Sequence, residues 1–61
     1  MSDRTISEIH EVENGSHTEV IVTAEDENGR TYVGTATYRN DSDYEKNEAF
    51  KIATEEAKNR G

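Results

Sequence analysis

TEVIVTAE, residues 18–25, decides the fold of this chain because a turn signal stands on each side of it. The segment is rich in β-branched residues, which favour strands. Asn14-Gly15 precedes it and Asn28-Gly29 follows it, and Asn-Gly between strand-like runs is the strongest local signal for a β-hairpin. We therefore predict a three-stranded antiparallel meander with strands at about residues 5–12, 17–26 and 30–39.

A helix is expected over residues 43–59. Ser42 followed by Glu45 is a capping-box pattern, which marks a helix start. The helix carries an apolar stripe at helical spacing, made by Ala49, Ala53 and Ala57 with Phe50 and Ile52 beside them. The predicted fold is therefore α+β: a three-stranded antiparallel β-meander followed by one C-terminal α-helix packed on one sheet face, in the order βββα.

The chain has 61 residues, which is enough for a single small domain spanning 1–61. We expect residues 1–4 to be disordered. There is no Cys and no apolar run of membrane-spanning length, so we expect no disulfide, no membrane contact and a cytoplasmic location. We expect no cofactor.

If each Asn-Gly pair is a two-residue loop, the strand register follows. Glu13 then pairs with Ser16, and Ile9 lies opposite Val20. In the second hairpin, Glu27 pairs with Arg30, and Val22 lies opposite Thr35. One predicted face carries Ile9, Val20, Val22, Ala24 and Val33 with Thr18, Thr35 and Thr37. The other carries Ile6, Val12, Ile21, Tyr32, Gly34, Ala36 and Tyr38 with Glu8, His10, His17, Glu19 and Glu25.

Both predicted faces are partly apolar, and one helix covers only one of them. An exposed apolar patch on so small a domain is typical of a partner surface. We therefore predict a homodimer or a docked protein partner. The predicted dimer or partner face consists of Ile6, Val12, Ile21, Tyr32 and Tyr38.

The charge is unevenly distributed. The formal net charge is −7, and residues 5–29 hold seven acids and no Lys or Arg. Such a patch repels phosphate and attracts basic surfaces. The candidate partner-binding residues are Glu8, Glu11, Glu19, Glu25, Asp26 and Glu27. The simpler interpretation is that these acids are solvent-exposed side chains that keep the protein soluble and prevent its edge strand from pairing with another chain.

The main functional hypothesis is a small acidic, non-catalytic protein-binding module. A sharper version is an inhibitor that mimics nucleic-acid charge and occupies a basic protein surface. No serine lies in a Gly-x-Ser-x-Gly elbow and no phosphate-binding glycine loop is present, so we expect no enzymatic activity.

Two alternatives stay open. The first is a nucleic-acid-binding domain that uses bases of the helix and third strand, although the acidic patch makes nucleic acid an unlikely ligand. Those bases are Arg30, Arg39, Lys46, Lys51 and Lys58. The second is a small metal-binding protein, because the predicted register puts His10, His17 and Glu19 on one face and imidazole and carboxylate are zinc ligands. A cross-strand His–Glu pair without metal is the simpler interpretation of this trio.

Overall fold

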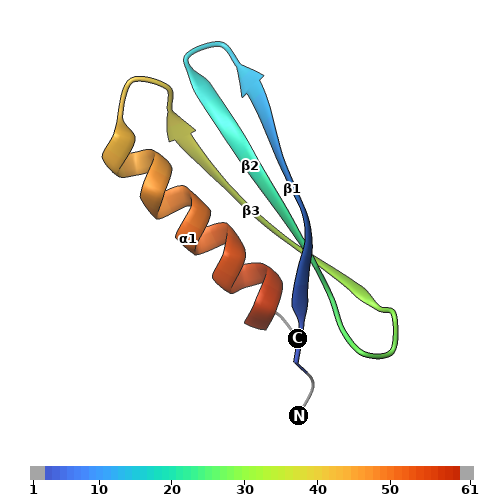
Figure 1. The fold of residues 1–61 in the computed structure, drawn as a ribbon. Coiled ribbons are helices and arrows are strands. Elements are labelled where there is room, and N and C mark those ends of the chain that lie inside the picture. The colour runs from blue at the N-terminus through green and yellow to red at the C-terminus, as the bar shows by residue number, and fades with distance from the viewer. Residues whose placement is uncertain (1–2, 60–61) are drawn as a thin grey trace.

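A computed structural model describes residues 3–59 of the chain. Its elements are β1 (Thr5–Asn14), β2 (His17–Glu25), β3 (Thr31–Arg39) and α1 (Asp43–Asn59). The strands form one antiparallel sheet in the order β1-β2-β3, and α1 packs on one face of it (Figure 1). The predicted α+β fold with βββα order is confirmed.

The first turn differs from the prediction by one position. Asn14 pairs with His17, so Gly15 and Ser16 are the loop residues. Gly15 has a φ of 68°, whereas Ser16 has a negative φ, because between residues 3 and 59 only glycines have positive values. A positive φ at the first central position alone is the mark of a type II′ turn. As a result, Ile9 lies opposite Val22, not opposite Val20.

A bulge in β1 changes the side on which Ile6 lies. The register shifts between Ile6 and Glu8, and Ile6 is opposite Ala24. An extra residue in one strand reverses the alternation beyond it. Ile6 therefore packs against the core under α1, and its predicted place on the opposite face was wrong.

The second turn is longer than predicted. Asp26 accepts a backbone hydrogen bond from Gly29 at 3.1 Å, and its own N–H donates to the Arg30 carbonyl at 3.0 Å. With Gly29 at a φ of 83°, this is a type I turn closed by a left-handed glycine. Val22 consequently lies opposite Gly34, and the predicted Val22–Thr35 pairing is wrong by one residue.

A one-residue slip moves every side chain of a strand to the other face. Tyr32, Gly34, Ala36 and Tyr38 therefore face α1, and Val33, Thr35 and Thr37 face away from it. The physical cause is the Asp26 side chain, whose Oδ1 accepts from the Asn28 and Arg30 amides at 2.9 and 3.0 Å. These two bonds stabilise the wider loop over a two-residue Asn-Gly turn.

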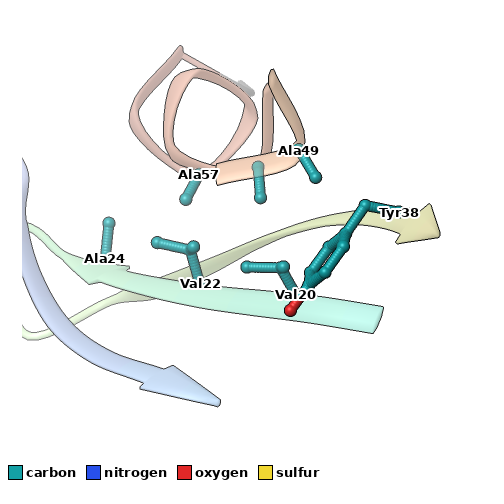
Figure 2. Packing of buried hydrophobic residues seen from close by; sticks show 7 residues of the cluster. Val20, Val22, Ala24, Tyr38, Ala49 and Ala57 are labelled. Atoms are coloured by element: carbon teal, nitrogen blue, oxygen red, sulfur yellow. The ribbon is translucent and has the colours of Figure 1, made fainter. Parts of the chain in front are cut away.

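The core lies between α1 and the sheet. Figure 2 shows Val20, Val22 and Ala24 of β2 pointing towards the helix. The buried hydrophobic residues are Val20, Val22, Ala24, Tyr38, Ala49, Ala53 and Ala57. Because the helix presents alanine, its backbone approaches the sheet closely, and it does so over Gly34.

Side-chain hydrogen bonds cap the start of α1. At its start, Ser42 Oγ accepts from the Glu45 N–H at 3.2 Å, as a capping residue should. The Glu45 carboxylate accepts from the Arg39 N–H at 3.2 Å instead of returning to Ser42, since the Ser42 N–H already donates to the Arg39 carbonyl.

Arg4 lies against the last turn of α1. It donates from Nη1 to the Ala57 carbonyl at 3.0 Å, and its guanidinium stacks 3.5 Å from the centre of the Tyr32 ring. The expected disorder of residues 1–4 stays a prediction; Arg4 makes the contacts just given, and residues 1 and 2 lie outside the described residues.

The sheet side facing away from α1, here called the outer face, is mostly polar. Its three large aliphatic side chains, Val12, Ile21 and Val33, are separated by threonine, glutamate and histidine. This is the alternation of an antiparallel sheet with one solvated face. The outer face is therefore partly apolar, as predicted, but it is less apolar than the predicted register implied, because Tyr32, Ala36 and Tyr38 lie on the side of α1 instead.

Candidate protein-binding surface

The helix does not cover the whole sheet. It packs mainly on β3, less on β2 and least on β1, and Figure 1 shows it alongside β3 with β1 on the far side of the sheet. The helix-facing side of β1 carries Ile9, Glu11 and Glu13, and all three are exposed. We call these three residues the bare strip.

A groove separates the bare strip from the start of α1. Its volume is about 330 Å³, which is at the lower end of the range for ligand sites. Acidic and neutral polar side chains dominate its lining, with one base. The lining residues are Glu11, Glu13, Thr18, Tyr38, Asn40, Asp43 and Lys46. We call this cavity the β1–α1 groove.

The floor of the groove is held by hydrogen bonds. The Tyr38 hydroxyl donates to Glu11 Oε1 at 2.7 Å. This bond and the burial of the phenol raise the pKa of Tyr38, and the charge of Glu11 acts in the same direction. The Tyr38 hydroxyl therefore holds the Glu11 carboxylate on the groove floor, whereas Glu13 lines the groove without such a bond to Tyr38.

Asn40, which follows β3, forms hydrogen bonds to the β1–β2 turn. Its N–H donates to the Ser16 carbonyl at 2.9 Å, and its Nδ2 donates to the Gly15 carbonyl at 3.1 Å. Its Oδ1 accepts from the buried Thr18 hydroxyl. The β1–β2 turn is thereby held against the end of β3, so the groove has a rigid end wall.

The predicted acidic patch divides between two sides of the sheet. Glu11 lies on the bare strip, whereas Glu8, Glu19 and Glu25 lie on the outer face. Glu27 is exposed in the β2–β3 turn. A second hollow of about 460 Å³, larger than the β1–α1 groove, lies on the outer face beside the first turn, and Val12, His17, Glu19 and Thr37 contribute to its lining.

Asp26 belongs to the turn and not to an accessible patch. Its side chain is buried, and its second oxygen accepts from the Tyr32 hydroxyl at 3.0 Å. The backbone hydrogen bond from Arg30 lowers the pKa of Asp26 most, and the bonds from Tyr32 and Asn28 add to this against the opposing effect of burial. The prediction that Asp26 presents a charge to a partner was wrong.

The five residues predicted as a dimer or partner face do not share a face. Val12 and Ile21 lie on the outer face, whereas Ile6, Tyr32 and Tyr38 lie on the side of α1. Tyr38 is buried under the helix. The homodimer was predicted from one contiguous apolar face, which these residues do not form. Self-association stays a prediction.

The predicted metal trio lies on the outer face but is not gathered around one point. His10 is opposite Ile21, and its Nε2 lies 3.0 Å from the Glu8 carboxylate. His17 is opposite Asn14, and its Nδ1 lies 3.1 Å from the Ser16 hydroxyl. Within residues 3–59, no three His, Asp or Glu side chains are placed to hold one ion.

Three of the five candidate bases, Arg30, Arg39 and Lys46, do not form one surface. Arg30 and Arg39 flank β3 at opposite ends, and Arg39 lies 3.5 Å from Asp41. Lys46 lies in the β1–α1 groove beside three acids. The clustering that a nucleic-acid-binding face requires is therefore missing from these three positions.

Sequence reasoning missed several groove residues. None of the site residues predicted from the sequence is Glu13, Asn40 or Asp43, and Lys46 is predicted only as one of the bases of the nucleic-acid-binding alternative. Their proximity to β1 depends on how α1 lies across the sheet. No feature of the sequence fixes this crossing of α1 and the sheet.

Comparison with protein-family models, with curated proteins and with solved structures finds no match for this chain. Among the described residues, no helix is both long enough and apolar enough to cross a bilayer.

Proposed function

We propose that the protein is a small acidic, non-catalytic module that binds a basic surface of another protein. The observation that supports this most is that the acids of the first hairpin and the β2–β3 turn lack basic partners. Within residues 3–59, none of the seven acids between positions 5 and 29 forms an ion pair with Lys or Arg. Six of them are exposed or half-buried.

Unpaired carboxylates of one sign on a small surface raise the association rate with a basic partner and repel acidic ones. A sharper form of the proposal is that the protein inhibits a nucleic-acid-processing protein by occupying its basic site. The separation of the acids over two sides of β1 fits a partner that surrounds the hairpin, as a nucleic-acid-binding cleft surrounds its ligand.

The test is a titration with defined ligands. A lysine-rich peptide and a duplex oligonucleotide, each fluorescently labelled, are titrated with the protein at about 20 mM and about 150 mM NaCl, where screening lengths differ severalfold. We expect the peptide to bind with an affinity that falls with salt and the oligonucleotide to show no binding. Oligonucleotide binding without peptide binding would instead support the nucleic-acid-binding alternative.

A matched pair of variants separates this patch from net charge alone. Glu19→Gln combined with Glu25→Gln removes two charges from the hairpin, and Glu48→Gln combined with Glu55→Gln removes two from the exposed side of α1. We expect the hairpin variant to weaken peptide binding more than the helix variant. Equal weakening would mean that the peptide responds only to overall charge.

A further inference from the structure

The side of the sheet that carries α1 is only partly covered, and this decides what kind of partner segment fits. We propose that the β1–α1 groove binds a basic amphipathic helix of the partner, which lies on β1 beside α1. This inference rests on the proposed function and specifies where the partner docks and which secondary structure it presents.

The dimensions favour a helix. A helix with its side chains is about 10 Å wide, and neighbouring strands lie about 4.8 Å apart, so one helix covers about two strands. α1 occupies the positions over β3 and β2. The bare strip on β1 together with the open space beyond its edge leaves room for a second helix on the same side.

The apolar part of the docking surface lies midway along β1. Ile9 faces the α1 side with 49% of its surface exposed, and Phe50 packs against the edge of the core while staying half-buried. Phe50 follows Lys46 by one helical turn, so both lie on the same side of α1. Ile9 and Phe50 lie beyond the lining of the groove, and a helix that runs along the bare strip past the groove would bury Ile9, which α1 leaves exposed.

The polar part lies towards the β1–β2 turn. Glu11 and Glu13 continue the bare strip beyond Ile9, and Asp43 faces them across the groove. Lys46 offsets one of these three charges, so the groove keeps a net negative charge. A partner helix with Lys or Arg at one end and an apolar stripe along its centre matches this sequence of side chains.

The same charges argue against other occupants. A second copy of this chain carries a formal charge of −7 and would bring its own acids into an acidic groove. A partner strand added to the free edge of β1 would extend the sheet but leave the groove empty, and it would meet the bulge between Ile6 and Glu8, a device that interrupts edge pairing.

The test uses two synthetic peptides of identical leucine and lysine composition, each about five helical turns in length. In one, leucine recurs with the helical period; in the other, leucine and lysine alternate as in a strand. Backbone amide shifts of the isotope-labelled protein are followed by NMR during each titration. We expect the helical-period peptide to bind at least about fivefold more tightly and to shift amides of the bare strip, Asp43, Lys46 and Phe50.

Matched variants on the two sides of β1 complete the test. The groove variant combines Ile9→Ser with Glu13→Gln, and the outer-face variant combines Val12→Ser with Glu19→Gln. Each replaces one aliphatic side chain by serine and removes one carboxylate, and Ile9 and Val12 are equally exposed. We expect the groove variant to weaken binding of the helical-period peptide at least about fivefold and the outer-face variant less than about twofold.

Two results would overturn the inference. The first is tighter binding by the alternating peptide, with shifts along the free edge of β1; the second is stronger weakening by the outer-face variant, which would place docking in the outer hollow. In both cases the protein still binds a basic segment, so the proposed function survives. If neither peptide binds at low salt, the proposed function itself fails.

Discussion

Gly34 lies where the helix backbone leaves no room for a side chain. A Cβ at this position would collide with the Ala53 carbonyl oxygen, and it would lie 2.6 Å from the Ala57 nitrogen and 2.9 Å from Glu56 Cβ. Backbone atoms of a packed helix cannot move independently, so we expect Gly34→Ala to lower the free energy of unfolding by about 3 kcal/mol.

Gly29→Ala is the matched control for this substitution. Gly29 has a φ of 83° and nothing within contact distance of an added Cβ, so only backbone strain opposes the change, at about 1 kcal/mol. Urea denaturation of both variants measures the difference. If Gly34→Ala were no more destabilising than Gly29→Ala, the close approach of α1 to β3 would be contradicted.

Asp26 makes the stability depend on pH in the acid range. The folded state lowers the pKa of Asp26, so the unfolded chain takes up a proton first as the pH falls. The stabilisation is complete above the unfolded pKa near 4 and is lost as the pH falls through the lower folded pKa. Thermal melts from neutral to acidic pH measure it.

Asp26→Asn removes this ionisation while it keeps the shape of the side chain. We expect the variant to melt below the wild type at neutral pH, since its amide cannot accept from Tyr32 and two backbone N–H groups together. The gap should narrow below pH 4, where the unfolded wild type binds a proton at Asp26 before the folded protein does. A gap that stays constant with pH would show that ionised Asp26 does not stabilise the turn.

At the scale of elements, the sequence predicted which elements form but not how two of them align. The periodicity of residues 49–57 and the turn signals at both Asn-Gly pairs placed four elements within two residues of their observed ends. The register of β3 was wrong because the side chain of Asp26 selected a three-residue loop. Ile6 was misplaced because no residue near Ser7 signals a bulge.

The candidate groove depended on a further step that the sequence does not contain. The alternation of side chains within a strand predicts which residues share a face. The fraction of the sheet that a helix covers depends instead on the position and angle at which the helix crosses the sheet. Here Gly34 and the alanine stripe draw α1 towards β3, and β1 is left uncovered. The acids Glu11 and Glu13 were visible in the sequence, whereas Asp43 as their neighbour was not.

Arg4 joins the start of β1 to the end of α1. Its hydrogen bond satisfies a carbonyl of the last helical turn, its charge suits the negative helix end, and its guanidinium stacks on Tyr32. We expect Arg4→Ala to destabilise the protein by about 1 kcal/mol. Arg4→Lys should recover less than half of this loss, because an ammonium group cannot stack as a planar guanidinium does.

Hydrogen exchange would show where the effect of Arg4 lies. Loss of the bond to Ala57 should accelerate exchange in the last turn of α1 and at the start of β1, and it should leave the β1–β2 turn unchanged. Uniform acceleration over the whole sheet would mean that Arg4 acts on global stability alone.

At the scale of the whole molecule, the fold combines a small core with an unbalanced charge. The largest fully buried side chains are two valines, so burial supplies little free energy to oppose repulsion among the seven acids between positions 5 and 29. Those acids have no Lys or Arg ion pair within residues 3–59. Binding to a basic partner would neutralise the same repulsion, so the function proposed for the surface and the stability of the fold depend on one set of charges.

Salt should therefore stabilise this protein. We expect the melting temperature to rise between about 0.02 M and 0.5 M NaCl, because the screening length falls below the spacing of the acids. Glu19→Gln with Glu25→Gln should flatten this dependence, since it removes repulsion. Lys51→Gln on the exposed side of α1 should steepen it, because it adds to the net negative charge. A melting temperature that is independent of salt in all three proteins would show that the acids are too far apart to repel one another, and the hairpin would then offer a partner no relief of electrostatic strain.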